Sequence, residues 1–274
     1  ETEILRSLDE RESCTLGLVA GVVDQVATQP ILFWKNSFQQ GLPFTVSPRV
    51  IYRGLFASCC NMACLTSMQF TFSGTCQKLL TGDASAKMSW GQEVTCGFLG
   101  GAMSGPACCL LELIMIQQQR FGGTMYGTLG RVVRDQGPAS LMRGLVGSTG
   151  REAVFTAGYL GSVPATRRWA KERGGLVTPE IDELLGTVTA GLVCGFLTQP
   201  CDTAKTCMQG DLERARYKGF LQTLGQLHRE YGSVKALYRG YLWRSLHIII
   251  DFIVLDKVAQ FLAPVVYPEK CRAR

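Results

Sequence analysis

Residues 198–209 read TQPCDTAKTCMQ, and residues 28–39 read TQPILFWKNSFQ. Both stretches contain Thr-Gln-Pro, a lysine five residues after the proline and a glutamine four residues after the lysine. They differ between these points, because Leu32 in the earlier stretch replaces the acid Asp202 of the later one. The shared spacing indicates an internal repeat, and the fold follows from how often this repeat occurs.

A third, more divergent copy lies in the middle of the chain. Leu110 takes the place of the proline there, with Gly101 nine residues before it and Gln119 nine residues after it. Each copy is followed by a second landmark, an Arg-Gly dipeptide that opens a long apolar run, at residues 53–54, 143–144 and 239–240. The chain is therefore expected to be one structural domain of three helix pairs, with repeats at 1–85, 86–175 and 176–274.

Six long helices are expected, near residues 13–40, 54–80, 89–120, 144–170, 181–210 and 240–263. Each is long enough to cross about 30 Å of hydrocarbon. The chain contains 46% hydrophobic residues and 31 glycines, with GxxxG-type spacings at 17–21 and 97–101. Such spacings allow helices to pack closely in lipid. These features predict an all-α membrane protein.

Charge is distributed unevenly over the connections between these helices. Basic residues dominate the connections within the pairs, with 11 basic and 4 acidic residues in segments 41–53, 121–143 and 211–239. The termini and the connections between pairs hold 8 basic and 11 acidic residues, in segments 1–14, 81–88, 170–184 and 265–274. The positive-inside rule then places both termini opposite the basic side. The net charge of +6 forms no Lys/Arg block with interleaved aromatic residues, so nucleic-acid binding is not expected.

The chemistry-bearing residues suggest neither an enzyme nor a metalloprotein. Twelve cysteines occur without a CxxC spacing, and two histidines are too few to complete a zinc site. We expect reduced thiols used as small apolar residues, with no metal, cofactor or disulfide framework. The sequence shows no nucleophile-base constellation and no phosphate loop. The first dozen residues lack the apolar core of a secretory signal, so any targeting segment is expected to be internal or already removed.

The repeated Pro-x-Asp-x-x-Lys-x-x-x-Gln pattern resembles the mitochondrial carrier family over nearly the whole chain. The third copy has the full pattern, the first keeps its proline, lysine and glutamine, and the second keeps Glu112 and Gln119 but has Leu110 and Met115. The resemblance implies a six-helix barrel in the inner mitochondrial membrane, with both termini towards the intermembrane space. It also implies a central cavity and alternating access.

In this family a ring of ion pairs closes the matrix side, and the acid of one copy meets the base of the next. The ring expected here has two ion pairs and one apolar pair: Lys35 with Asp202, Lys205 with Glu112, and Leu32 with Met115. A lone buried charge costs several kcal/mol, whereas replacing both partners by apolar groups can be neutral. An alternative is that Met115 only fills space. Three glutamines are expected to brace the ring: Gln39, Gln119 and Gln209.

The family closes its opposite side with acids and bases near the ends of the even helices. Here the acid positions are Gly74, Pro164 and Gln260, and the base positions are Gln77, Arg167 and Ala263. Because no complete pair survives, the equilibrium is expected to favour the matrix-closed form. The first repeat is also short, with 24 residues from anchor to landmark glycine against 34 and 40 in the others. This leaves little room there for an amphipathic helix.

The sequence and the resemblance together offer two kinds of candidate binding site. The possible substrate contacts are Asn61, Arg151, Glu152, His247 and Asp24, although His247 and Asp251 have the i,i+4 spacing at which they would satisfy each other. The possible cardiolipin sites are Arg53, Gly54, Arg143, Gly144, Gly219, Arg239 and Gly240, with ordinary interfacial anchoring as the alternative.

The degenerate gates favour one function and the retained residues favour another. Loss of the second gate favours a carrier kept as a membrane-embedded accessory subunit of a respiratory or ATP synthase complex. The retained ion pairs and the Arg151-Glu152 couple favour the alternative, a working exchanger of a small amino-acid-like or anionic metabolite.

Overall fold

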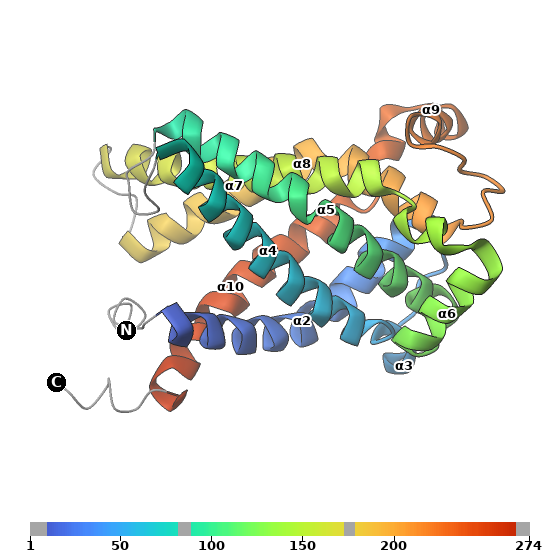
Figure 1. The fold of residues 1–274 in the computed structure, drawn as a ribbon, viewed down its shortest axis with the longest axis horizontal. Coiled ribbons are helices and arrows are strands. Elements are labelled where there is room, and N and C mark those ends of the chain that lie inside the picture. Colours follow the sequence, from blue (N-terminus) through green and yellow to red (C-terminus); the bar gives the residue numbers. More distant parts are fainter. Residues whose placement is uncertain (1–9, 82–88, 173–178, 267–274) are drawn as a thin grey trace.

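The computed structural model describes residues 10–81, 89–172 and 179–266. Six long helices dominate this part of the chain (Figure 1): α2 (Glu10–Gln40), α4 (Leu55–Thr81), α5 (Trp90–Phe121), α7 (Leu145–Glu172), α8 (Pro179–Gly210) and α10 (Tyr241–Val266). Each begins and ends within three residues of its expected position, which confirms the all-α, three-pair fold. Local signals set some of these ends. Ser89 forms a capping box with Gln92 at the start of α5.

Short helices connect the two members of each pair, and all three lie at the same end of the molecule (Figure 1), here called the short-helix end. They are α3 (Pro48–Ile51), α6 (Met125–Gln136) and α9 (Phe220–Tyr231), and 3-10 turns follow the last two at Pro138–Met142 and Val234–Tyr238. The first has 4 residues against 12 in each of the others, as the short connection predicted.

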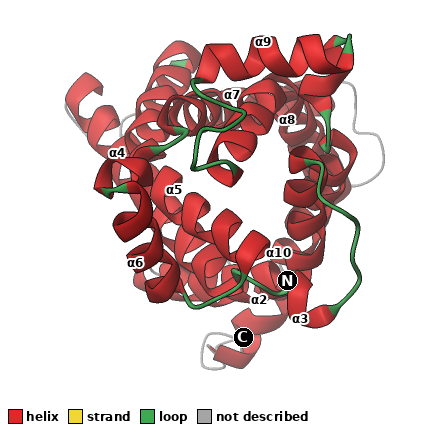
Figure 2. Cartoon of the chain, turned by 90° about the vertical axis from the view of Figure 1, so that its right-hand side faces the viewer, coloured by secondary structure: helices red, strands yellow, loops and turns green. Residues whose placement is uncertain are grey.

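The long helices form a closed ring around a central axis (Figure 2). The ring follows chain order, with α2 packed on α4, α4 on α5, α5 on α7, α7 on α8 and α8 on α10, and α10 closes it against α2. Two glycines of α5 allow it to pack closely against α7. A Cβ added at Gly101 would lie 2.4 Å from the backbone oxygen of Glu152, and one at Gly105 would lie 2.4 Å from Oγ1 of Thr149.

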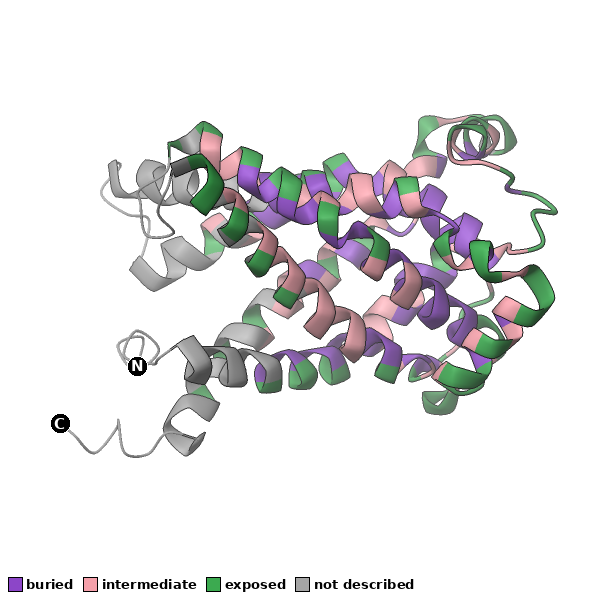
Figure 3. Ribbon diagram, viewed as in Figure 1, coloured by how far each residue is buried: buried purple, intermediate pink, exposed green. Residues whose placement is uncertain are grey.

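The ring is more polar inside than outside. On α2, Asp24, Gln25, Thr28 and Gln29 are buried, whereas Val19, Val22, Val23 and Val26 are more than 40% exposed. Buried residues occupy the helix faces towards the centre, and exposed residues face outwards (Figure 3). Within the described residues one helix, Gly91–Phe121, is long and apolar enough to cross a membrane by composition, with a mean hydropathy of 1.6. The inward polar residues lower the hydropathy of its neighbours.

Candidate functional site

The landmark glycines join each repeat to the next. Gly54, Gly144 and Gly240 all have positive φ, at 82°, 87° and 77°, a conformation that favours glycine. A Cβ added to them would lie 3.1 Å from a side-chain Cγ on the odd helix of the following repeat, in Met115, Lys205 and Gln39 respectively. The start of each even helix is therefore packed directly against the part of the next repeat that holds the base position.

A second set of contacts repeats around the ring. The residue before each anchor position bonds to the carbonyl oxygen of its own landmark arginine: Gln29 to Arg53 at 3.2 Å, Gln199 to Arg239 at 2.9 Å, and Cys109 to Arg143 at 3.3 Å. Sequence reasoning missed this role, although the repeated Thr-Gln-Pro carries its signal. These bonds tie the odd helix of each pair to the start of its even helix.

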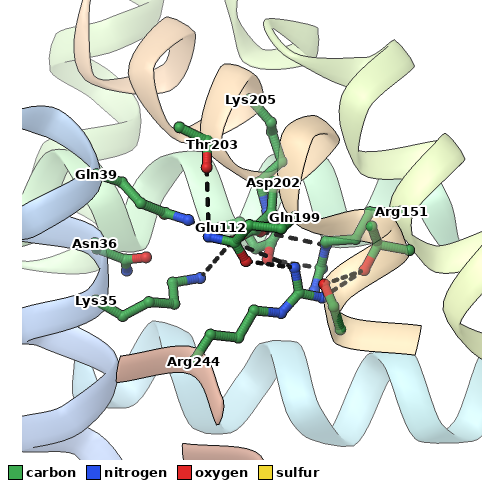
Figure 4. Close-up of polar contacts among 12 residues, drawn as sticks. Lys35, Asn36, Gln39, Glu112, Arg151, Gln199, Asp202, Thr203, Lys205 and Arg244 are labelled. Atoms are coloured by element: carbon green, nitrogen blue, oxygen red, sulfur yellow. Dashed lines mark hydrogen bonds and ion pairs between the residues drawn. The ribbon is translucent and has the colours of Figure 1, made fainter. Parts of the chain in front are cut away.

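Two ion pairs and one apolar contact lie where the odd helices converge. Lys35 Nζ lies 2.9 Å from Asp202 Oδ2, and Lys205 Nζ lies 2.6 Å from Glu112 Oε2. Leu32 packs against the apolar cluster that contains Met115. The structure thus brings together the four charged residues of the predicted ring, with the acid of one repeat against the base of the next (Figure 4).

Asp202 is the electrostatic centre of this network. Its carboxylate is fully buried, and four bases lie within 4 Å of it: Lys35 at 2.9 Å, Lys205 at 3.2 Å, Arg151 at 3.6 Å and Arg244 at 3.9 Å. Arg244 also donates to the Gln199 side chain at 3.2 Å and to Thr198 Oγ1 at 2.8 Å. Sequence reasoning missed Arg244, which lies on α10 one helical turn before the predicted contact His247.

Arg151 links the predicted substrate contacts to the ion pairs. Its Nη2 lies 2.8 Å from Glu112 Oε1 and also bonds to Glu152. Glu152 is buried and accepts a bond from Gln69 Nε2 on α4 at 3.1 Å. Arg151 and Arg244 approach the same centre from α7 and α10 (Figure 4), so two guanidinium groups of different repeats converge there.

The three predicted glutamine braces have different partners. Gln39 Nε2 donates to Asp202 Oδ2 at 2.9 Å, directly under the ion pair with Lys35. Gln119 instead accepts from Asn36 Nδ2 at 2.8 Å, a bond that ties α5 to α2 beside the apolar pair. Gln209 donates to the backbone oxygen of Cys109 at 3.1 Å. Of these three glutamines, Gln39 is the one whose side chain bonds to a member of an ion pair.

The remaining predicted contacts lie on α2, α4 and α10. His247 Nδ1 lies 2.5 Å from Asp251 Oδ2, which is the mutual satisfaction that their spacing suggested. Asp24 is 1% exposed. One side-chain oxygen of Asp24 and one of Asn61 are buried and find no partner among the described residues. The predicted opposite gate, at residues 74, 77, 164, 167, 260 and 263, falls on side chains outside those described.

Each landmark arginine lies against the C-terminal end of the odd helix of the following repeat, as Arg143 and Arg239 show. Arg143 is 6% exposed and donates to Met208 O at 2.7 Å, near the end of α8, and to Tyr217 O in the segment that follows. The Arg239 guanidinium lies 5.8 Å over the Phe38 ring at the end of α2. Positive charge at a helix C-terminus is favourable. The buried Arg143 side chain is thus occupied within the protein, whereas the cardiolipin sites predicted from the sequence remain a prediction.

Comparison with known proteins agrees with this geometry. The sequence profile of the family "Mitochondrial carrier protein" matches residues 179–264. The tricarboxylate transporter FUM11 of Gibberella moniliformis is 27% identical, over 97% of this chain and 93% of its own. The chain belongs to the mitochondrial carrier family. This carrier is also similar to the mitochondrial tricarboxylate transporter 1 of Mycosarcoma maydis, at 26% identity over 94% of this chain and 97% of the relative.

A further relative bears on function. The probable mitochondrial 2-oxoglutarate/malate carrier protein of Dictyostelium discoideum is 24% identical over 82% of this chain and 80% of its own. The names of these relatives indicate transport, and they favour the exchanger over the accessory subunit that the degenerate gates suggested. Family membership places this carrier in the inner mitochondrial membrane.

Proposed function

We propose that this carrier transports a small di- or tricarboxylate anion across the inner mitochondrial membrane by alternating access. The convergence of Arg151 and Arg244 on Asp202 carries the proposal, because it assembles a site for carboxylates at the centre of the ring. The network contains one more base than acid: Lys35, Arg151, Lys205 and Arg244 against Glu112, Glu152 and Asp202. The relatives named as tricarboxylate and 2-oxoglutarate/malate carriers support the same class of substrate.

The arrangement indicates how a substrate would release the closed end. Arginine binds carboxylates in bidentate geometry. A substrate carboxylate that takes Arg151 from Glu112, or Arg244 from Asp202, weakens the contacts that hold α5, α7, α8 and α10 together. A ligand shifts a conformational equilibrium only by its difference in affinity for the two states. The anion must therefore bind the open state more tightly than the closed state, by at least the free energy needed to separate the two ion pairs.

The amino-acid alternative fits the geometry less well. A zwitterion needs a free acid for its ammonium group, and the sequence offered Glu152 for this purpose. In the structure Glu152 is 2% exposed and already bonded to Arg151 and Gln69. Surplus positive charge in the network and an occupied acid beside Arg151 together favour an anion at this site.

Anionic lipid at the short-helix end is part of the same proposal. A pocket of about 260 Å³ opens beside Gly144, and Arg214, Lys218 and Phe220 also line it. Basic side chains next to apolar ones suit a phospholipid headgroup and its chains. The proposed lipid would bind there and at the equivalent helix starts at Gly54 and Gly240.

The test of transport is uptake into liposomes loaded with the same anion. Purified carrier is expected to exchange radiolabelled malate, 2-oxoglutarate or citrate, and Arg151→Gln and Arg244→Gln are each expected to lower the rate at least tenfold. The matched control is Arg134→Gln, because the Arg134 side chain is 78% exposed on α6. Unchanged exchange in both site variants would contradict the proposed site. A wild-type protein that exchanges none of these anions and comigrates with a large complex would restore the accessory-subunit hypothesis.

A further inference from the structure

A second group of ionisable side chains lies inside the ring, away from the ion-pair network. It consists of Asp24 on α2 with His247 and Asp251 on α10, two helices that pack together. Asp24 precedes Lys35 by eleven residues in the same helix, which corresponds to about 16 Å along its axis. The group is therefore displaced from the network towards the end of the barrel opposite the short helices.

Asp24 is the most constrained member. It is 1% exposed, and its Oδ1 has no hydrogen-bond partner in the part of the chain that the structure describes. The charged group that acts on it is another acid, Asp251, across the interface between α2 and α10. Thr28 donates to the backbone oxygen of Asp24 and not to its carboxylate.

The α10 side of the group is also incompletely bonded. His247 Nδ1 and Asp251 Oδ2 are 2.5 Å apart, while His247 Nε2 and Asp251 Oδ1 are buried and have no partner among the described residues. These side chains are 14% and 26% exposed, so they are more accessible than Asp24. A proton on the His247 imidazole can therefore pass to the Asp251 carboxylate through a single hydrogen bond.

The bases described on the helices around Asp24 are engaged elsewhere in the ring. Three bases on the packed helices belong to the network below: Lys35 on α2, Lys205 on α8 and Arg244 on α10. The acid Asp202 on α8 is paired with the same three. Lys78 is exposed near the far end of α4. On α4, which packs on α2, the neutral Asn61 has a buried oxygen without a partner among the described residues.

Two carboxylates that face each other in a membrane interior do not both ionise cheaply, because each disfavours the charge of the other. Such pairs hold one proton between them. A protonated Asp24 supplies the missing donor, since its hydroxyl can bond to Asp251 or to Asn61. Chains of acids and histidines within membrane helices are typical of proton pathways.

We propose that Asp24, Asp251 and His247 form a proton-binding site that carries one proton with each substrate anion. The inference rests on the proposed anion transport and deepens it. The proton comes from water in the compartment to which the cavity is open, and it forms an O–H bond on the Asp24 carboxyl. It leaves to water on the other side after the conformational change, and no electron is transferred. Each cycle thus moves one negative charge fewer than the anion itself carries.

The first experiment follows protons and anion together. Liposomes containing the carrier and a trapped pH-sensitive dye are given 2-oxoglutarate at a series of external pH values. The expected wild-type result is internal acidification with uptake, and a rate that rises by up to about tenfold for each unit fall in external pH. Asp24→Asn mimics the protonated acid, so its uptake is expected to lose both the pH dependence and the dye signal. Asp135→Asn, a change to an exposed acid on α6, should behave as wild type. A wild type without a dye signal, or an Asp24→Asn variant with the wild-type pH profile, would overturn the proposal.

The second experiment needs no transport. Infrared spectroscopy of the full chain in detergent at neutral pH is expected to show the carbonyl band of a protonated carboxylic acid. This band should be present in wild type and Asp135→Asn and absent from Asp24→Asn. Its absence from wild type would refute the proton site whether or not the protein transports. A band without any transport would refute the proposed function and leave proton binding intact.

Discussion

Replacing the apolar pair of the ring by charges gives a direct test of the paired-loss argument. Met115 is 4% exposed and lies in the apolar cluster on which Leu32 packs. Leu32→Asp or Met115→Lys alone therefore buries a single charge, which costs about 3 to 5 kcal/mol when no partner is present. For a chain of this length the loss corresponds to a fall in Tm of about 10 °C.

The double variant is expected to recover most of that loss. Lysine is expected to fit at position 115, because Lys205 occupies the equivalent position of the next repeat in the same surroundings. A Cβ added to Gly144 would lie 3.1 Å from Lys205 Cγ, and a Cβ added to Gly54 would lie 3.1 Å from Met115 Cγ. The new pair would copy the Lys35 contact to Asp202 at 2.9 Å. We expect a coupling free energy of about 2 to 3 kcal/mol between the two changes.

The assay is thermal unfolding of purified protein in detergent, with both single variants and the double variant measured side by side. Leu32→Asn is the matched control, since it adds polarity at the same site without charge and is expected to lose less. Additive losses in the double variant would show that positions 32 and 115 do not face each other. That result would contradict the explanation that the charges at positions 32 and 115 were replaced as a pair.

Two further predictions concern packing and pH. Gly101→Val is expected to lower the Tm markedly, because its Cβ would lie 2.4 Å from the backbone oxygen of Glu152 and force α5 away from α7. The control is Gly130→Ala on α6, where an added Cβ meets nothing within 4 Å. In the same thermal assay this variant should have an equal or slightly higher Tm. Partial burial raises the pKa of Asp211, but backbone N–H groups of residues 215–217 and the Arg143 guanidinium outweigh it and hold that pKa below its usual value. Its stabilising effect is present above the pKa of the unfolded chain and is lost as pH falls through the lower folded value. The Tm difference between wild type and Asp211→Asn should therefore shrink on acidification, and a difference that stays constant down to low pH would contradict this.

Much of the fold was predictable because its signals are local. The Pro, Lys and Gln spacing of the repeats, the landmark glycines and the apolar runs set the six helices to within three residues. The short first connection predicted the four-residue α3. Even the pairing of Lys35 with Asp202 followed from the order of the repeats, once the resemblance to the carrier family was recognised.

The partners of long side chains were not predictable in the same way. Helical spacing tells which face a residue occupies, but the reach of an arginine depends on how closely the neighbouring helices pack. Arg244 was missed for this reason, and Arg151, predicted as a substrate contact coupled to Glu152, also bonds to Glu112. Gln119 and Gln209 likewise found partners on other helices instead of the ion pairs.

The sequence by itself determined the three helix pairs, the apolar exterior and the acids and bases available to the ring, because each depends on residue type and spacing along one helix. Only the tertiary structure decided that four bases converge on Asp202 and that, among the described side chains, the charged neighbour of Asp24 is the acid Asp251. These contacts join helices that are distant in sequence. Their distances are set by glycine-mediated packing across the ring, which no single helix encodes.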